Sequence, residues 1–243
     1  MLVNYISLLA FLAVCQGYNY TKQGKDWVGT CKTGKAQSPI PISFSNSVLA
    51  DSGAGMMHFN FTNATATGNF TLQGLFLLGN FGTISYMTSS FEYSGEIDLI
   101  TFWAPSQHTL NGKHTDMEIT FRTGASPEYY TTSMFLQTGS KDNVFIDQVL
   151  NITKGVKSQQ ISLNRLGLMN TTTEFYSYEG SVSFPPCSEN VTWNLIPKAL
   201  TIGKTQLAVF QSHWAKNKTF AGGHGNNRIL QKIHGRSLEL YRS

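Results

Sequence analysis

Short runs in which apolar and polar residues alternate dominate this chain. Alternation with a period of two is typical of half-buried strands. Turn signals such as Asn111-Gly112 and Pro185-Pro186 separate the runs. The pattern predicts strands over residues 58–61, 69–72, 83–87, 97–103, 117–122 and 191–196.

Helical periodicity is confined to two stretches, residues 140–150 and 204–214. The second stretch places apolar residues such as Leu207 and Trp214 on one helical face. No internal repeat and no Pro- or Gly-rich linker divides the chain. We therefore expect one mainly β (α+β) domain over residues 18–243, with short peripheral helices.

The composition narrows the class of protein. The chain has 243 residues, of which 41% are hydrophobic and 13% are charged. These values exclude a disordered, charge-rich chain. The formal net charge of +4 is spread thinly and contains no long run of Lys or Arg. We therefore expect no nucleic-acid partner.

Residues 1–17 differ from the rest of the chain. The stretch from Leu2 to Val14 is apolar and uncharged, and it is shorter than the ~20 residues that a bilayer span needs. The small residues Cys15 and Gly17 end the stretch. We expect a secretory signal peptide, with an uncleaved anchor or a buried strand as alternatives. Cleavage would leave no transmembrane segment and a secreted, extracellular or cell-surface protein.

Glycosylation acceptors agree with secretion. The Asn-X-Thr pattern occurs eight times, always with Thr, and we expect a glycoprotein in which several of these sites are occupied. Asn190 is the site that we expect to stay unused, because residues 191–193 read as a buried strand. The acceptors are Asn19, Asn60, Asn63, Asn69, Asn151, Asn170, Asn190 and Asn217.

Cysteine usage fits an oxidising compartment. If Cys15 leaves with the signal segment, Cys31 and Cys187 remain. An even pair favours one disulfide, and two separate buried thiols are the alternative.

Five sequence blocks follow one another in an order that resembles a known family. They are Gln37-Ser38-Pro39-Ile40, Pro105-Ser106-Gln107-His108, Asp116-Met117-Glu118, Ser183-Phe184-Pro185-Pro186-Cys187 and Asn226-Asn227-Arg228. Together they resemble the α-carbonic anhydrases over nearly all of residues 18–243. The resemblance implies a central, twisted, mostly antiparallel ten-stranded sheet. It also implies that Cys31 and Cys187 are disulfide partners.

The resemblance also locates the zinc positions. Carbonic anhydrases hold zinc with three histidines, two on the strand before the Pro-Ser-Glu-His segment and one after the Asp-Met-Glu segment. Counting back from Pro105 places Thr101 and Trp103 at the first two positions. Counting forward from Leu99 instead implies a two-residue deletion, which places Trp103 at the first ligand position. The third position is Thr120, and in either register the strand contains no histidine.

These replacements do not suit zinc. A Thr hydroxyl is neutral and weakly basic, and the Trp indole has no acceptor atom. The bulk of Trp103 is expected to fill the space that the metal and its water need. We therefore predict no zinc, no other cofactor and no hydration of carbon dioxide, which makes this a degenerate carbonic anhydrase.

Other working positions of the family have changed as well. Gln107 replaces the glutamate that orients the gatekeeper hydroxyl, and Ser183 replaces the gatekeeper threonine. Thr83 stands where the resemblance expects the proton-shuttle histidine. No catalytic residue is therefore predicted.

Two residues around the former site are retained. Glu118 matches the carboxylate that holds the third zinc ligand from behind. With no ligand to orient, we expect Glu118 to bond Thr120 or a buried water. His108 matches a buried structural histidine of the family.

Three functions fit these observations. The first is a non-catalytic structural or binding component of an extracellular assembly, whose partner is a protein, a glycan or a second copy of the chain. The old active-site mouth, with Trp103, Phe81 and Phe184, is its candidate apolar contact.

The second is an active enzyme with a displaced zinc site. Its ligands would come from carboxylates and from His58, His114, His213 and His224. The third is a glycan-binding module in which aromatic residues of the old cleft stack on a sugar. Its candidates are Trp103, Tyr129-Tyr130 and Phe175-Tyr176.

Overall fold

The computed structural model describes residues 18–50, 55–70, 74–125, 128–152, 158–215 and 218–242. The expected signal segment over residues 1–17 lies outside these ranges, as does Asn217. Among the described residues, no helix is long and apolar enough to cross a membrane.

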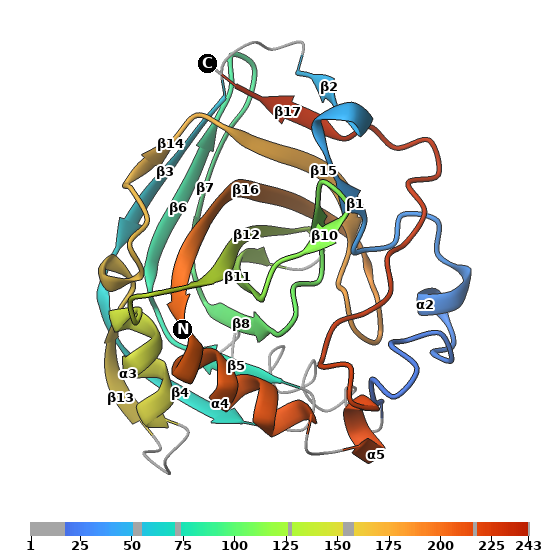
Figure 1. Cartoon of the computed structure of the whole chain (residues 1–243). Coiled ribbons are helices and arrows are strands. Elements are labelled where there is room, and N and C mark those ends of the chain that lie inside the picture. Colours follow the sequence, from blue (N-terminus) through green and yellow to red (C-terminus); the bar gives the residue numbers. More distant parts are fainter. Residues whose placement is uncertain are drawn as a thin grey trace.

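Strands account for most of the regular structure, and the helices are short (Figure 1). The helical elements are α2 (Thr30–Thr33), η1 (Phe44–Asn46), α3 (Val144–Ile152), η2 (Leu163–Leu166), α4 (Lys204–Ala215) and α5 (Lys218–Ala221). The strands are β1 (Pro41–Ile42), β2 (Val48–Leu49), β3 (Met56–Phe61), β4 (Asn63–Phe70), β5 (Leu75–Leu78), β6 (Gly82–Met87), β7 (Glu92–Glu96), β8 (Leu99–Trp103), β9 (Thr109–Leu110), β10 (Lys113–His114), β11 (Met117–Ala125), β12 (Glu128–Gly139), β13 (Ser158–Ser162), β14 (Thr171–Thr172), β15 (Phe175–Ser181), β16 (Glu189–Gly203) and β17 (Glu239–Tyr241).

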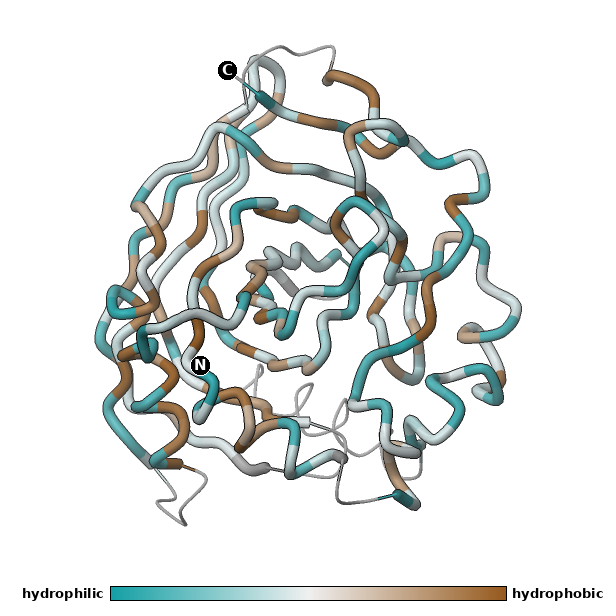
Figure 2. Tube along the Cα trace, in the orientation of Figure 1, coloured by the Kyte–Doolittle hydropathy of each residue, from teal (hydrophilic) through white to brown (hydrophobic). Residues whose placement is uncertain are grey.

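One ten-stranded sheet forms the centre of the molecule. Its order is β13-β4-β5-β8-β11-β12-β16-β15-β17-β2. Only the β12–β16 and β17–β2 pairs are parallel within it. The prediction of a mostly antiparallel ten-stranded sheet is therefore confirmed. Hydrophobic and hydrophilic residues alternate along much of the trace (Figure 2), as strands with two different faces require.

Two smaller sheets flank the large one. A four-stranded sheet has the order β14-β3-β6-β7, and a three-stranded sheet has the order β1-β9-β10. Tyr86 joins the four-stranded sheet to the large one, because its ring meets Phe175 at 5.4 Å and Tyr241 at 5.8 Å in edge-to-face contacts. Such contacts stabilise beyond the area they bury.

Strand β8 is buried on both faces, and four of its five residues are apolar. On one face, Phe102 stacks at 6.3 Å on Phe145 of α3 and at 5.8 Å on Phe210 of α4. On the other face lie Thr101 and Trp103, since successive side chains of a strand point in opposite directions. Helices α3 and α4 therefore cover the face of β8 that lies opposite the two zinc-ligand positions assigned by the resemblance.

The predicted helices occur, but the first starts later than expected. The prediction began at residue 140, whereas α3 begins at Val144. Asn143 is the reason, because its side-chain oxygen accepts the main-chain N–H groups of Phe145 (3.1 Å) and Ile146 (3.3 Å). A side chain that caps the first turn in this way fixes the start of a helix.

The amino-terminal segment is tied to the sheet by a covalent bond and a buried cation. Cys31 and Cys187 form a disulfide that spans 156 residues of sequence, which confirms the predicted pairing. The Arg228 guanidinium donates to the main-chain oxygens of Cys31 and Ser38, each at 2.7 Å. Burial lowers the pKa of Arg228 to about 10, so the side chain remains a cation at neutral pH.

Removing the disulfide should lower the free energy of unfolding substantially. For a loop of this length, the chain-entropy account gives about 4–5 kcal/mol. We expect Cys31→Ser, Cys187→Ser and the double variant to lose the same amount in denaturant titrations, since each removes the same single bond. A double variant about as stable as the wild type would contradict this account.

A buried polar network joins β11 to the loop before β9. Glu118 accepts hydrogen bonds from the main-chain N–H of His108 (2.9 Å), from His108 Nδ1 (2.9 Å) and from Ser133 Oγ (2.5 Å). His108 Nε2 meets the Tyr178 hydroxyl at 2.7 Å. Burial would raise the pKa of Glu118, but the attraction of His108 and these hydrogen bonds outweigh it and hold the pKa below its ordinary value.

The lowered pKa makes Glu118 a source of stability at neutral pH. Because the pKa of Glu118 is lower in the folded state than in the unfolded state, its carboxylate stabilises the fold fully above the unfolded-state pKa of about 4.3. This stabilisation is lost as the pH falls through the folded-state pKa. Glu118→Gln should lower the free energy of unfolding by about 3 kcal/mol at pH 7. This loss of unfolding free energy should become smaller in acid. The exposed Glu96→Gln variant is the control and should change stability by less than about 0.5 kcal/mol. A Glu118→Gln protein as stable as wild type at pH 7 would refute the role.

Candidate functional site

Three side chains from two neighbouring strands meet at the position that the resemblance assigns to zinc. In the β8–β11 register, Thr101 lies opposite Thr120 and Trp103 lies opposite Glu118. The hydroxyls of Thr101 and Thr120 hydrogen-bond each other, and the Trp103 indole N–H lies 3.5 Å from the Thr120 hydroxyl. All three side chains are buried. Thr101 and Trp103 lie two residues apart on β8 and therefore share one face.

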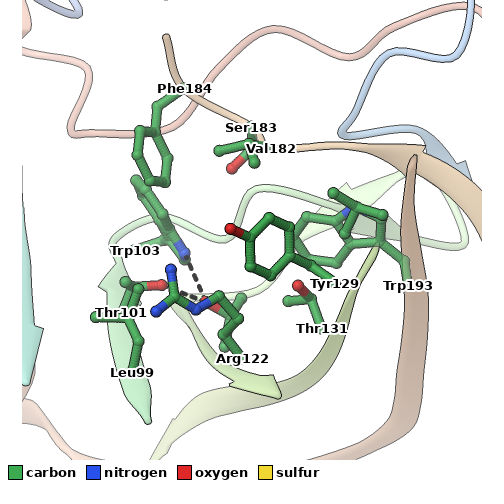
Figure 3. Close-up of a pocket in the computed structure, with 12 residues that line it drawn as sticks. Leu99, Thr101, Trp103, Arg122, Tyr129, Thr131, Val182, Ser183, Phe184 and Trp193 are labelled. Carbon is green, nitrogen blue, oxygen red and sulfur yellow. Dashed lines mark hydrogen bonds between the residues drawn. The ribbon is translucent and has the colours of Figure 1, made fainter. Parts of the chain in front are cut away.

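The cavity above these residues is small and mostly apolar. Its volume is about 40 Å³, which leaves room for only a few water molecules. Trp103 packs against Phe184 with ring centroids 5.8 Å apart, and these two rings fill one side of the cavity (Figure 3). The lining residues are Leu99, Thr101, Trp103, Thr120, Arg122, Tyr129, Thr131, Val182, Ser183, Phe184, Val191 and Trp193.

Arg122 is a feature of this site that the sequence reasoning missed. It forms a two-pronged ion pair with Asp98, with Nε–Oδ1 at 3.0 Å and Nη2–Oδ2 at 2.6 Å. Its guanidinium also lies over the Tyr129 ring at 5.4 Å. The sequence did contain a signal for Arg122. Side chains two residues apart on a strand point to the same face, so Arg122 faces the same side of β11 as Thr120.

The residues at this position do not fit a zinc ion. Zinc in proteins is bound by imidazole nitrogen, thiolate sulfur or carboxylate oxygen. The three inward side chains supply two neutral hydroxyls, already bonded to each other, and an indole that has only a donor. Trp103 is buried beside them and lines the same small cavity.

The other altered positions are dispersed. Ser183 lines the cavity, with its hydroxyl directed into it (Figure 3). Gln107 is fully buried behind the site, where Oε1 accepts the Arg228 main-chain N–H at 2.9 Å and Nε2 has no hydrogen-bond partner among the described residues. Thr83 lies on β6 opposite Glu96 and is not part of the cavity lining.

The expectation that Glu118 would bond Thr120 is wrong. The carboxylate is bonded to His108 and Ser133 instead. The register explains the difference, because it leaves the Thr120 hydroxyl directly opposite Thr101. His108 is fully buried, as its match to a structural histidine implies.

The histidines proposed for a displaced metal site lie apart. His58 on β3 meets Thr171, and His114 on β10 meets the main-chain oxygen of Ser106 at 2.8 Å. His213 belongs to α4. Within the described ranges, no group of three or more His, Cys, Asp or Glu side chains is arranged to hold a metal ion.

The aromatic candidates do not form one surface either. Tyr129 lines the cavity, whereas Tyr130 points to the other face of β12 and stacks on Tyr93 at 3.8 Å. Phe81 is fully buried outside the cavity lining, and Phe184 and Trp103 are buried as well. The expected apolar contact at the old mouth is therefore wrong, because these rings pack against the protein itself.

Four of the glycan acceptors in the described residues are exposed, namely Asn60, Asn63, Asn170 and Asn190. The burial argument against Asn190 fails. Val191 and Trp193 are buried, but Asn190, the second residue of β16, is exposed. Asn19 and Asn151 are partly buried, and the side chain of Asn69 lies outside the described part.

Comparisons with known proteins agree with this architecture. A family model described as eukaryotic-type carbonic anhydrase matches residues 22–242. Alpha carbonic anhydrase 7 of Arabidopsis thaliana is 24% identical over 219 residues, which cover 87% of this chain and 76% of that protein. Dioscorin DB3L of Dioscorea polystachya is 25% identical over 230 residues, which cover 92% of this chain and 81% of that protein.

A solved structure shares the fold. Carbonic anhydrase Cah3 from Chlamydomonas reinhardtii, in complex with acetazolamide, superimposes with a TM-score of 0.70 and 26% identity, over 88% of this chain and 94% of that one. The ten-stranded sheet and the matched residues lead to the same conclusion: the chain belongs to the eukaryotic-type carbonic anhydrase family.

Proposed function

We propose that this chain is a non-catalytic carbonic anhydrase-like protein that binds no zinc. It acts as a structural or binding component of an extracellular or cell-surface assembly. The observation that carries the proposal is the hydrogen-bonded pair of Thr101 and Thr120 beneath the Trp103 indole. Three histidines would have to stand at these positions for carbonic anhydrase chemistry.

The proposal follows from what the reaction requires. Hydration of carbon dioxide at neutral pH needs a metal that lowers the pKa of a bound water to about 7. The hydroxyls of Thr101 and Thr120 are neutral and have no charge with which to hold such a metal. Trp103 and Phe184 fill the volume above them. The site is built as a packed core instead of a reaction chamber.

The disulfide and the exposed acceptors support an extracellular role. A disulfide persists in oxidising compartments and is rare in the cytosol. The exposed Asn60, Asn63 and Asn170 lie on or beside β3 and β4, since the main-chain oxygen of Asn170 accepts the Phe59 N–H at 2.8 Å. Glycans at these sites would cover one side of the molecule. The partner, whether a protein, a glycan or a second copy, would then approach from another side.

The first test is metal content. Purified, dialysed protein should contain less than about 0.1 zinc per chain by mass spectrometry, because its inward side chains lack zinc donors. Stopped-flow measurements should give no carbon dioxide hydration above the uncatalysed rate, with or without a sulfonamide. One tightly bound zinc per chain would overturn the proposal.

A rebuilt site provides the matched control. The triple variant Thr101→His, Trp103→His, Thr120→His puts three imidazoles on one face of β8 and β11. It should bind about one zinc per chain if folded, since three neutral imidazoles leave one open position. Thermal unfolding in the presence and absence of zinc checks that the variant is folded. Zinc binding by the wild type equal to that of the triple variant would contradict the assignment.

Glycosylation tests the extracellular part. Protein secreted from eukaryotic cells should lose mass on treatment with an endoglycosidase that releases N-linked glycans. Asn60→Gln, Asn63→Gln and Asn170→Gln should each remove one glycan, because these side chains are exposed. Retention inside the cell with no glycan on any acceptor would contradict this part of the proposal.

A further inference from the structure

A second pocket lies on the face of the large sheet opposite the small cavity. Tyr130 on β12 is paired with Thr192 on β16, and Thr192 is paired with Glu179 on β15. Paired residues point to the same side of a sheet, so these three form one row. Tyr129 and Trp193, their neighbours along the chain, face the small cavity. The row therefore faces away from it.

The next residues on the same face extend this floor. Ser177 is paired with Glu239, and Tyr241 follows two residues after Glu239 on β17. The hairpin between β6 and β7 adds Thr88, Ser90 and Phe91 to the lining. Its tip lies beside β17 (Figure 1). The cavity volume is about 490 Å³, which lies in the range of small-ligand sites. The lining residues are Tyr86, Thr88, Ser90, Phe91, Tyr130, Ser177, Glu179, Thr192, Glu239 and Tyr241.

Four aromatic rings form the walls of this pocket. Phe91 lies between Tyr86 (5.9 Å) and Tyr130 (6.4 Å), and Tyr86 meets Tyr241 at 5.8 Å. Phe91 is 44% exposed, so part of the wall is free to contact a ligand. Burial raises the pKa of Tyr86 and of Tyr130, and the phenols stay neutral at physiological pH.

Two carboxylates supply the charge of the pocket. Glu179 accepts the Thr192 hydroxyl at 2.8 Å, and Glu239 accepts the Tyr241 hydroxyl at 2.8 Å. Within the described ranges, neither carboxylate forms a salt bridge, and no Lys or Arg lines the pocket. Arg236 bonds the main-chain oxygen of Glu179, but its guanidinium lies over Tyr178, whose side chain is on the opposite face. The pocket is therefore aromatic and negatively charged.

We propose that this pocket binds an organic cation, an alkylammonium group that lies against the Phe91, Tyr86 and Tyr130 rings and pairs with Glu179 and Glu239. Aromatic faces attract cations, and quaternary ammonium groups are recognised by aromatic cages of this kind. The two carboxylates add charge that no lining cation neutralises. A neutral sugar could stack on the same rings but would gain no charge attraction from the two carboxylates. The site is independent of the function proposed above.

The ammonium group has two possible sources, a free small molecule and a lysine side chain of a partner protein. Choline, titrated calorimetrically into the purified full chain, represents the first source. A capped Gly-Lys-Gly peptide represents the second. We expect choline or the peptide to bind with a Kd of about 1 mM, and the one that binds identifies the source. No binding of either up to about 20 mM would overturn the proposal.

Variants and a neutral ligand separate charge from shape. The alcohol 3,3-dimethylbutan-1-ol has the shape of choline without its charge and should bind at least about tenfold more weakly. Glu179→Gln combined with Glu239→Gln should weaken binding of the cation about tenfold, and so should Phe91→Ala. Glu96→Gln, which removes an exposed carboxylate from the far end of β7, is the control and should leave binding unchanged. Equal binding of the alcohol, or unchanged binding by the double variant, would also overturn the proposal. Thermal unfolding of each variant verifies the fold.

Discussion

The antiparallel register between β8 and β11 is the constraint on which the site depends. It sets Thr101 against Thr120 and Trp103 against Glu118, all on one face of the sheet. A slip of one residue would turn this set toward the helices and would bring Phe102 into the cavity. The helix contacts of Phe102 hold the register, because they bury that ring fully on the opposite face.

The contacts that stabilise the fold are separate from the zinc position. The Glu118–His108–Ser133 network remains complete although Thr120 offers nothing for Glu118 to orient. Its partners are held by β12 and by the loop before β9, so the network ties the strands together. The disulfide and Arg228 do the same for the amino-terminal segment. The fold of the family therefore persists here on contacts that do not involve the zinc position.

The two faces of the large sheet carry different chemistry. The face that lines the small cavity carries neutral hydroxyls, an indole and a guanidinium that is paired with Asp98. The opposite face, beneath the β6–β7 hairpin, carries aromatic rings and two carboxylates around a larger cavity. Alternation along β12 and β16 divides the two sets, since Tyr129 and Tyr130 are consecutive residues that point in opposite directions.

The sequence alone determined the strand-rich class, the helix over residues 204–214 and the absence of histidine from the strand at 97–103, because these depend on local periodicity and residue identity. The resemblance added the ten-stranded sheet and the pairing of Cys31 with Cys187. Only the tertiary structure decided the pairing of Thr101 with Thr120, the partners of Glu118 and the capping of α3 by Asn143. The pocket beneath the β6–β7 hairpin also forms only in the tertiary structure, because its lining comes from β6, the β6–β7 turn, β12, β15, β16 and β17. Strands far apart in sequence become neighbours only through pairing, and no local pattern encodes which faces will meet.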